Sequence, residues 1–80
     1  MARSTTFTLS LLSEGHVSLS VFDVRGRRVA TLVDAPRSSG DSDVVWSGTD
    51  GRGERLPSGV YLLRLETGMS VTTRKLVLLR

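Results

Sequence analysis

Hydrophobic and polar side chains alternate along several short segments of this chain, and this alternation constrains the fold more than any other feature. Residues 5–12 alternate phenylalanine and leucine with threonine and serine, and residues 16–24 alternate valine and leucine with serine. A period of two places one face of a strand in a core and the other face in water. Glycine-rich or acidic turns separate these segments. The pattern therefore predicts an all-β domain.

Turn-forming residues divide the middle of the chain into further strands. Gly26 is expected to reverse the chain between the strand at residues 16–24 and the next one, because glycine adopts a positive φ at low cost. Residues 34–43 are rich in proline, serine and glycine and predict a loop. A short strand follows, which carries the single tryptophan, Trp46, as a core residue.

The last part of the chain contains a long loop and a closing hairpin. Residues 47–59 are dominated by turn chemistry and are long for a hairpin connection. Residues 60–67 and 70–80 are then expected to pair across Gly68 and Met69. Strands at this spacing predict a β-sandwich of about seven short, mostly antiparallel strands.

Length and composition allow one small domain. Eighty residues, 39% of them hydrophobic, supply a single core, and the absence of cysteine removes disulfides and thiolate metal sites as sources of stability. We assign residues 5–80 to the sandwich and residues 1–4 to a linker or to the start of a segment excised from a longer protein. No run of residues has the length of a signal-peptide core or of a membrane-spanning helix.

The sequence does not predict an enzyme. His16 is the only histidine, so it is the one candidate base for a nucleophilic triad, and it falls at a strand start without a cysteine to accompany it. Carboxylate pairs for acid–base chemistry would have to come from Asp41 and Asp43 or from Asp50 and Glu54. We expect both pairs on loops, without an apolar pocket to raise a pKa.

The same four carboxylates are the candidate ligands for a metal ion. They could offer oxygen atoms to calcium if their two loops converged, and calcium-stabilised adhesion is one alternative function. No EF-hand loop is present, however, and Arg52 and Arg55 oppose a bound cation. We therefore expect solvated turn acids, with no metal and no cofactor.

Three arginines, Arg25, Arg27 and Arg28, cluster at the turn around Gly26. Such a patch could contact the phosphates of nucleic acid or of lipopolysaccharide. The chain has one tryptophan, one tyrosine and two phenylalanines, and none lies between these arginines as a stacking platform. Nucleic-acid binding is not expected, a solvated turn is the commoner interpretation, and lipopolysaccharide contact is an alternative.

The final strand is apolar on both faces, since four hydrophobic residues follow one another from Leu76 to Leu79. Two interpretations are open. The commoner one is a strand covered on both faces within the sandwich. The other is an edge strand that pairs with a partner or with a neighbouring copy.

The segment from Pro57 to Tyr61 is expected to form a corner that leads into a strand. Pro57 restricts φ, and Gly59 allows the chain to turn tightly. Tyr61 can then cover the core with its ring while its hydroxyl reaches a nearby backbone group.

Three motifs together carry a resemblance to a known family. They are V-x-D-x-x-G-R at Val21, Asp23, Gly26 and Arg27, W-x-G-x-D at Trp46, Gly48 and Asp50, and P-S-G-V-Y with Pro57, Gly59 and Tyr61. With their flanking strands they resemble the Ig-like sandwich family shared by the C-terminal sorting domains of type IX secretion cargo and the Ig-like domain of the flagellar hook-capping protein. The resemblance extends from about Thr5 to Arg80 and implies an Ig-like β-sandwich.

The resemblance implies a noncatalytic C-terminal sorting domain, which directs a secreted protein through the periplasm and across the outer membrane to the surface of a Gram-negative bacterium. Its partners would be the outer-membrane type IX machinery and a passenger domain on its N-terminal side. The terminal strand would carry recognition, through Lys75, Leu76, Val77, Leu78, Leu79 and Arg80. The alternative is a structural Ig-like module or spacer in an extracellular protein or appendage.

Overall fold

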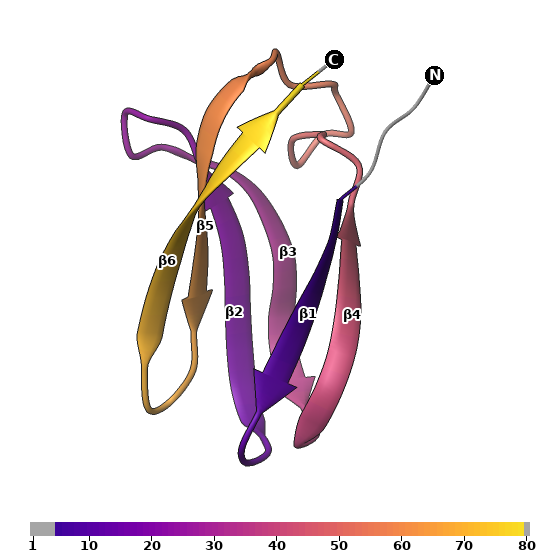
Figure 1. Cartoon of the computed structure of the whole chain (residues 1–80), viewed down its shortest axis with the longest axis vertical. Coiled ribbons are helices and arrows are strands. Elements are labelled where there is room, and N and C mark those ends of the chain that lie inside the picture. The colour runs from indigo at the N-terminus through magenta and orange to yellow at the C-terminus, as the bar shows by residue number, and fades with distance from the viewer. Residues whose placement is uncertain (1–4, 80) are drawn as a thin grey trace.

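The computed structural model describes residues 5–79, which form six strands and no helix that could cross a membrane. The strands pair into two antiparallel sheets, one of two strands in the order β1-β4 and one of four in the order β3-β2-β5-β6 (Figure 1). The molecule is therefore an all-β sandwich of Ig-like type. The strands are β1 (Thr5–Leu11), β2 (Gly15–Phe22), β3 (Arg28–Arg37), β4 (Gly40–Trp46), β5 (Gly59–Glu66) and β6 (Val71–Leu78).

The core lies between the two sheets and consists of the inward side chains of all six strands. The inward residues of β2 form the centre of the core, since Val17, Leu19 and Val21 are at most 1% exposed. Burial of these side chains is the main source of stability in a chain without disulfides. The buried hydrophobic residues are Leu9, Val17, Leu19, Val21, Ala30, Val33, Val44, Trp46, Tyr61, Leu63 and Leu78.

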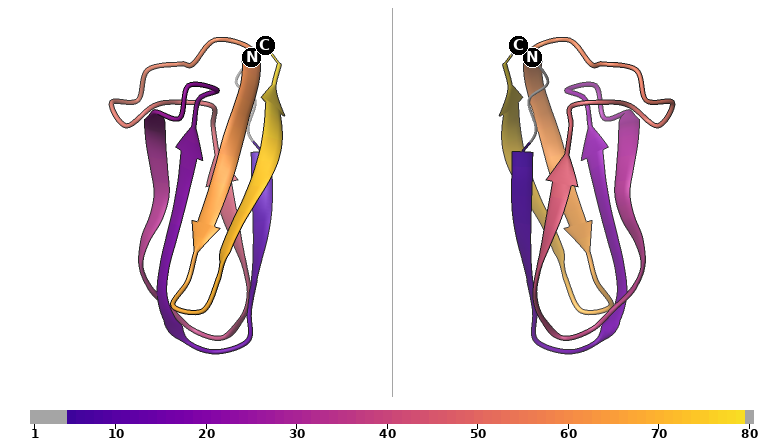
Figure 2. Two further views of the ribbon diagram at one scale, coloured as in Figure 1. Left: turned by 90° about the vertical axis from the view of Figure 1, so that its left-hand side faces the viewer. Right: turned by 90° about the vertical axis from the view of Figure 1, so that its right-hand side faces the viewer.

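Both predicted hairpins are present. Strands β2 and β3 pair on either side of the turn that contains Gly26, and β5 pairs with β6 across Gly68 and Met69. The start of β1 and the end of β6 lie at the same end of the sandwich as the long loop between β4 and β5 (Figures 1 and 2).

The prediction of a loop at residues 34–43 is wrong. Strand β3 continues to Arg37 and β4 already begins at Gly40, so the connection is two residues long. Proline is tolerated at position 36 because β3 is the outer strand of its sheet. No further strand lies on its open side, so no hydrogen bond to such a strand is lost when the N–H is missing. As a result, Asp41 and Asp43 lie on strand β4 and not on a loop.

The interpretation of the final strand as covered on both faces is also wrong. Strand β6 is the outermost strand of the four-stranded sheet, and Val77 is 52% exposed on it. The physical reason is that a two-layer sandwich buries only the inner face of each sheet, and Val77 lies on the outer face while Leu78 lies on the inner one.

Candidate functional site

A turn of five residues joins β2 to β3 and is held by one carboxylate. The backbone N–H groups of Arg25 and Arg27 donate to Asp23 Oδ1 at 2.9 and 3.0 Å, and Arg27 Nε donates to Asp23 Oδ2 at 2.9 Å. Gly26 has a φ of 84°, a value that favours glycine. The hydrogen bond from the Arg27 backbone, followed by that from its side chain, lowers the pKa of Asp23.

A second turn in the loop after β4 repeats this geometry. The backbone N–H groups of Arg52 and Glu54 donate to Asp50 Oδ1 at 2.9 and 3.0 Å, and Gly53 has a φ of 86°. The N–H of Gly51 also donates to the carbonyl of Val29 at 3.2 Å, so this turn is attached to β3. Asp50 therefore orders a loop and is not set up for acid–base chemistry with Glu54.

The repetition was missed by sequence reasoning, although its signal is present. Both turns share the pattern D-x-R-G, at residues 23–26 and 50–53. The aspartate accepts from the N–H groups two and four residues later, and the glycine supplies the positive φ. The spacing of Asp23 and Gly26 in the first family motif thus recurs at Asp50 and Gly53.

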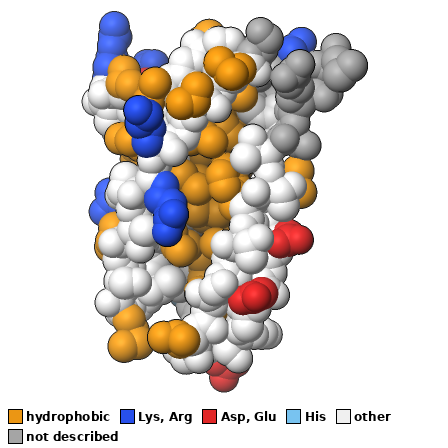
Figure 3. Space-filling model, in the orientation of Figure 1, with side chains coloured by type: hydrophobic (Ala, Val, Ile, Leu, Met, Phe, Trp, Pro, Cys, Tyr) orange, Lys and Arg blue, Asp and Glu red, His pale blue; other side chains and the backbone are white. Residues whose placement is uncertain are grey.

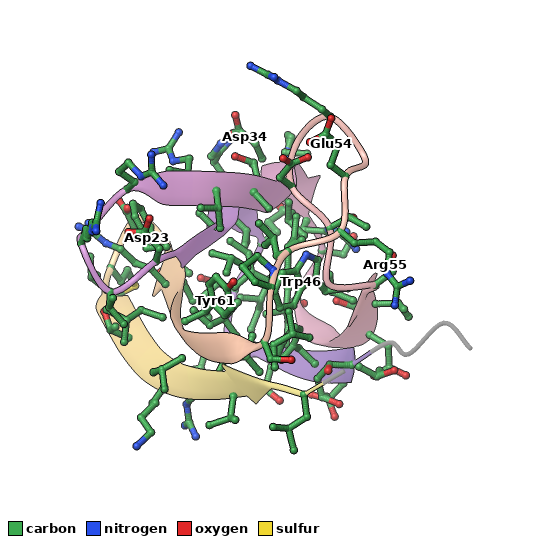
Figure 4. The ribbon with its side chains drawn as sticks, turned by 90° about the horizontal axis from the view of Figure 1, so that it is seen from above. Asp23, Asp34, Trp46, Glu54, Arg55 and Tyr61 are labelled. Carbon is green, nitrogen blue, oxygen red and sulfur yellow. The ribbon has the colours of Figure 1, made fainter. Side chains whose placement is uncertain are left out.

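Trp46 and Tyr61 lie between the two sheets at the same end of the molecule (Figure 4). Their rings meet edge to face, with centroids 6.1 Å apart and planes at 73°. The Tyr61 hydroxyl donates to the carbonyl of Pro57 at 2.7 Å, and Trp46 Nε1 donates to the carbonyl of Thr49 at 2.9 Å. The expected corner is present, and each ring uses its polar atom to hold the loop between β4 and β5.

The two remaining glycines of the family motifs, Gly48 and Gly59, lie in different elements. Gly48 is buried, has a φ of 74° and accepts a hydrogen bond on its carbonyl from the N–H of Leu56 at 2.9 Å. Gly59 is the first residue of β5. The ten motif residues thus lie at the end of β2 and in the turn after it, at the end of β4 and in the loop after it, and at the start of β5, all at one end of the sandwich.

The candidate catalytic and metal-binding residues do not converge. His16 is exposed at the start of β2, and its Nε2 lies 2.6 Å from Asp34 Oδ1 on the neighbouring strand. Asp43 is exposed on β4 and accepts a hydrogen bond from Thr8 Oγ1 at 3.1 Å. Within residues 5–79, no three side chains of histidine, aspartate or glutamate are grouped so that they could hold a metal ion.

The arginine cluster is exposed, and two of its members have local partners. Arg27 pairs with Asp23, and the guanidinium of Arg28 lies 5.8 Å from the centroid of the Phe22 ring. Arg25 is exposed within the same turn. This arrangement fits a solvated turn held by Asp23.

The residues proposed for partner recognition divide between the two faces of β6. Leu76 and Leu78 face the core, opposite Tyr61 and Gly59 of β5. Lys75 and Val77 alternate with them and are exposed on the outer face. Leu79 follows the strand and is 67% exposed, and Arg80 lies outside the described residues.

An apolar patch adjoins the outer face of β6. Val77 is paired with Val60 of β5, which is 40% exposed, and the next outward pair is Lys75 with Leu62. Within residues 5–79, neither Lys75 nor Arg74 makes an ion pair. The edge of the larger sheet therefore presents unpaired positive charge beside two exposed valines.

Comparison with known families shows to which family this sandwich belongs. The family model described as the FlgD Ig-like domain matches residues 2–70. The chain belongs to the FlgD Ig-like domain family. The match ends at the residue before β6, so the sequence likeness to the family does not include that strand.

Solved structures support the same fold. FlgD from P. aeruginosa is similar with a TM-score of 0.72 and 24% identity, over 94% of this chain and 59% of that one. FlgD from Xanthomonas campestris, described as a hook-capping protein essential for flagellar assembly, is similar with a TM-score of 0.68 and 25% identity, over 92% and 54%. The chain thus spans a little over half the length of each FlgD structure.

PorZ, described as an essential surface component of the type IX secretion system of Porphyromonas gingivalis, shares the fold at lower similarity. Its TM-score is 0.57 with 20% identity, over 82% of this chain and 8% of PorZ. No curated protein matches the chain by sequence.

Proposed function

We propose that the chain is a noncatalytic Ig-like structural module, which holds a neighbouring protein in an extracellular or appendage assembly through the edge of β6. The observation that carries this proposal is that β6 is an outermost strand with Lys75 and Val77 exposed on it. Membership of the FlgD Ig-like domain family supports it, because hook capping by FlgD is a structural role in an appendage.

The physical argument concerns the cost of a bare strand edge. An edge strand presents unpaired N–H and C=O groups, and soluble proteins protect such edges with charges, prolines or bulges. Strand β6 has no proline and is charged only at Arg74 and Lys75, so the end that follows them, with exposed Val77 on the strand and exposed Leu79 just beyond it, is left unprotected. A protein neighbour that covers this end would remove apolar surface from water and satisfy the open backbone groups.

Site-specific photo-crosslinking in the native host tests this proposal. A photoreactive residue in place of Val77 should link the chain to a neighbouring protein, because position 77 lies on the proposed docking edge. Val45 is the matched control, since it is a valine of similar exposure, 61% against 52%, on the other sheet. Equal linking from both positions, or none from position 77, would contradict the proposal.

The second candidate function is a sorting domain read by the outer-membrane type IX machinery, with localisation at the surface of a Gram-negative bacterium. The observation that favours it is the accessible terminal strand, in which basic Arg74 and Lys75 precede an apolar segment. The shared fold of PorZ is consistent with it.

A reporter fusion in a host with type IX machinery separates the two candidates. A sorting domain should bring the reporter to the cell surface, and deletion of residues 75–80 should abolish this while the reporter stays folded. Retention of both fusions in the periplasm would exclude sorting in that host and favour the structural module. A Lys75→Glu fusion tests whether the outward positive charge takes part.

A further inference from the structure

A groove runs along the side of the sandwich where both sheets end, between β1 and β6. Its volume is about 510 Å³, and Leu19, Leu63 and Leu65 contribute to its floor. Figure 3 shows hydrophobic side chains exposed along this hollow, with Lys and Arg on the β6 flank and Asp and Glu beyond the β1 flank. The lining residues are Thr6, Phe7, Thr8, Leu9, Ser10, Leu19, Leu63, Leu65, Thr72 and Arg74.

Both walls of the groove are outermost strands. Strand β1 pairs only with β4, and β6 pairs only with β5, within the described part of the chain. Each strand therefore turns one row of backbone N–H and C=O groups away from its own sheet. A chain segment lying in the groove in an extended conformation could bond to one of these rows.

The two sheets differ in width by more than is usual for this fold. Ig-like sandwiches of constant type pair a sheet of four strands with one of three, whereas here a sheet of four faces a sheet of two. A third strand beside β1 would lie over the inner face of β5 and β6, where the groove is. The geometry of the groove thus corresponds to one strand.

Charge in the groove is one-sided. Arg74 is paired in register with Leu63, so it lies on the inner face of β6, on the same side as Leu76 and Leu78. It lines the groove and has no ion-pair partner within residues 5–79. Strand β1 carries no charged residue, and its inward side chains on the opposite wall, Phe7 and Leu9, are apolar. An occupant with a carboxylate opposite Arg74 would complete this site.

We propose that the groove binds an extended strand of a partner protein, in which apolar side chains alternate with polar ones and one inward position is aspartate or glutamate that pairs with Arg74. This inference rests on the proposed docking role of the module and names the chemistry of its partner. The apolar side chains would cover Phe7 and Leu65, which are partly buried in the groove wall and floor.

A second copy of the chain is a poorer occupant. A second β6 would bring Arg74 and Lys75 against like charges, which destabilises strand pairing. A second β1 has no carboxylate to offer. Strand β4 has Asp41 and Asp43, but they share a face with exposed Val45, while the opposite face carries Val44 and Trp46 into its own core.

Peptide binding to the 80-residue chain tests the proposal. One probe is a capped peptide of about eight residues, a usual strand length, in which valine alternates with threonine and the central valine is replaced by glutamate. The other probe has lysine at that position. Titration followed by backbone amide NMR should show tighter binding of the glutamate peptide, by about tenfold, with shifts concentrated in β1 and β6.

A charge reversal with a matched control identifies the residue responsible. The Arg74→Glu variant should prefer the lysine peptide, and Arg74→Gln should bind both peptides alike. Lys75→Glu makes the same charge change one residue later on the outer face, and it should leave the preference for glutamate intact. Both sites are exposed, so the three variants should unfold at the same temperature as the parent chain.

Four outcomes would overturn the inference: no saturable binding of either peptide, equal affinity of the parent chain for both, reversal of the preference by Lys75→Glu as well, or self-association of the chain through this groove in sedimentation experiments. Crosslinking from position 77 together with one of these outcomes would support the docking role but exclude the groove as the binding site. Peptide binding without crosslinking from position 77 would support the groove as a binding site but contradict the docking role of the β6 edge.

Discussion

The end of the sandwich that holds the loop after β4 and the side between β1 and β6 are organised in opposite ways. At the former, Tyr61, Trp46, Asp23 and Asp50 each make a hydrogen bond to backbone within a few residues of themselves. On the open side, two strand edges and Arg74 have no such partners in the described residues. The difference leads us to predict that the hydrogen bonds of the closed end contribute mainly to stability, and that the binding we propose uses the exposed residues of the open side.

This separation matters because the margin of stability is narrow. A domain of this size has a free energy of unfolding on the order of 3–5 kcal/mol. Residues at the closed end therefore cannot be varied freely, whereas exposed residues of the groove can change to suit a partner. The predictions below test this contrast.

The largest effect is expected at Tyr61. Replacement by alanine leaves a cavity beside Trp46 and should cost about 3–5 kcal/mol, which is enough to unfold the chain. Tyr61→Phe keeps the ring but removes the donor to the Pro57 carbonyl, and it should cost about 1–2 kcal/mol. Urea denaturation followed by circular dichroism measures both. A folded Tyr61→Ala variant of unchanged midpoint would show that the closed end does not carry stability.

A smaller loss of stability is expected when asparagine replaces the aspartate of either turn, and the loss should differ between the two turns. Asparagine can keep the Oδ1 bonds to two backbone N–H groups in both turns. Asp23→Asn also loses the acceptor for the Arg27 side chain, whereas in the second turn Glu54 stands at the corresponding position and cannot donate from its carboxylate. Asp23→Asn should therefore lower the melting temperature more than Asp50→Asn does. Equal melting temperatures would mean that the ion pair adds nothing to the turn.

The same carboxylate predicts how stability changes at acid pH. The pKa of Asp23 is lowered in the folded state, so folding favours its ionised form. The contribution of Asp23 to the free energy of unfolding is fully present at pH values above its ordinary pKa of 3.8. It is lost as the pH falls below 3.8 towards the lower pKa of the folded state. Denaturation midpoints over this range should fall less steeply in Asp23→Asn than in the parent chain. Parallel curves would contradict the assignment.

The smallest effect is expected on the open side. Thr8→Val on β1 keeps a β-branched side chain and removes the hydrogen bond to Asp43, which is exposed to solvent. The free energy of unfolding should change by no more than about 0.5 kcal/mol, as for most surface substitutions. A loss above about 1 kcal/mol in urea denaturation would show that the groove wall takes part in stability.

Much of the fold could be predicted from the sequence, and the errors have a common cause. Alternation and turn residues correctly placed the hairpins and put Trp46 and Tyr61 in the core. The false loop at residues 34–43 arose because proline, serines and aspartates usually indicate turns. On an outer strand and on solvent-facing positions the same residues are compatible with pairing, and which strands are outermost cannot be inferred from a local pattern.

The sequence by itself determined the local features: the period of two, the glycine and aspartate pattern of both turns, and the corner at residues 57–61. These depend on interactions within about five residues, so local residue order is sufficient. Only the tertiary structure decided that β6 is an edge and that Arg74 lines a groove beside β1. Strand order decides which strand is an edge, and the number of strands in the opposite sheet decides how much of the inner face is covered. Both are set by contacts between residues far apart in the chain.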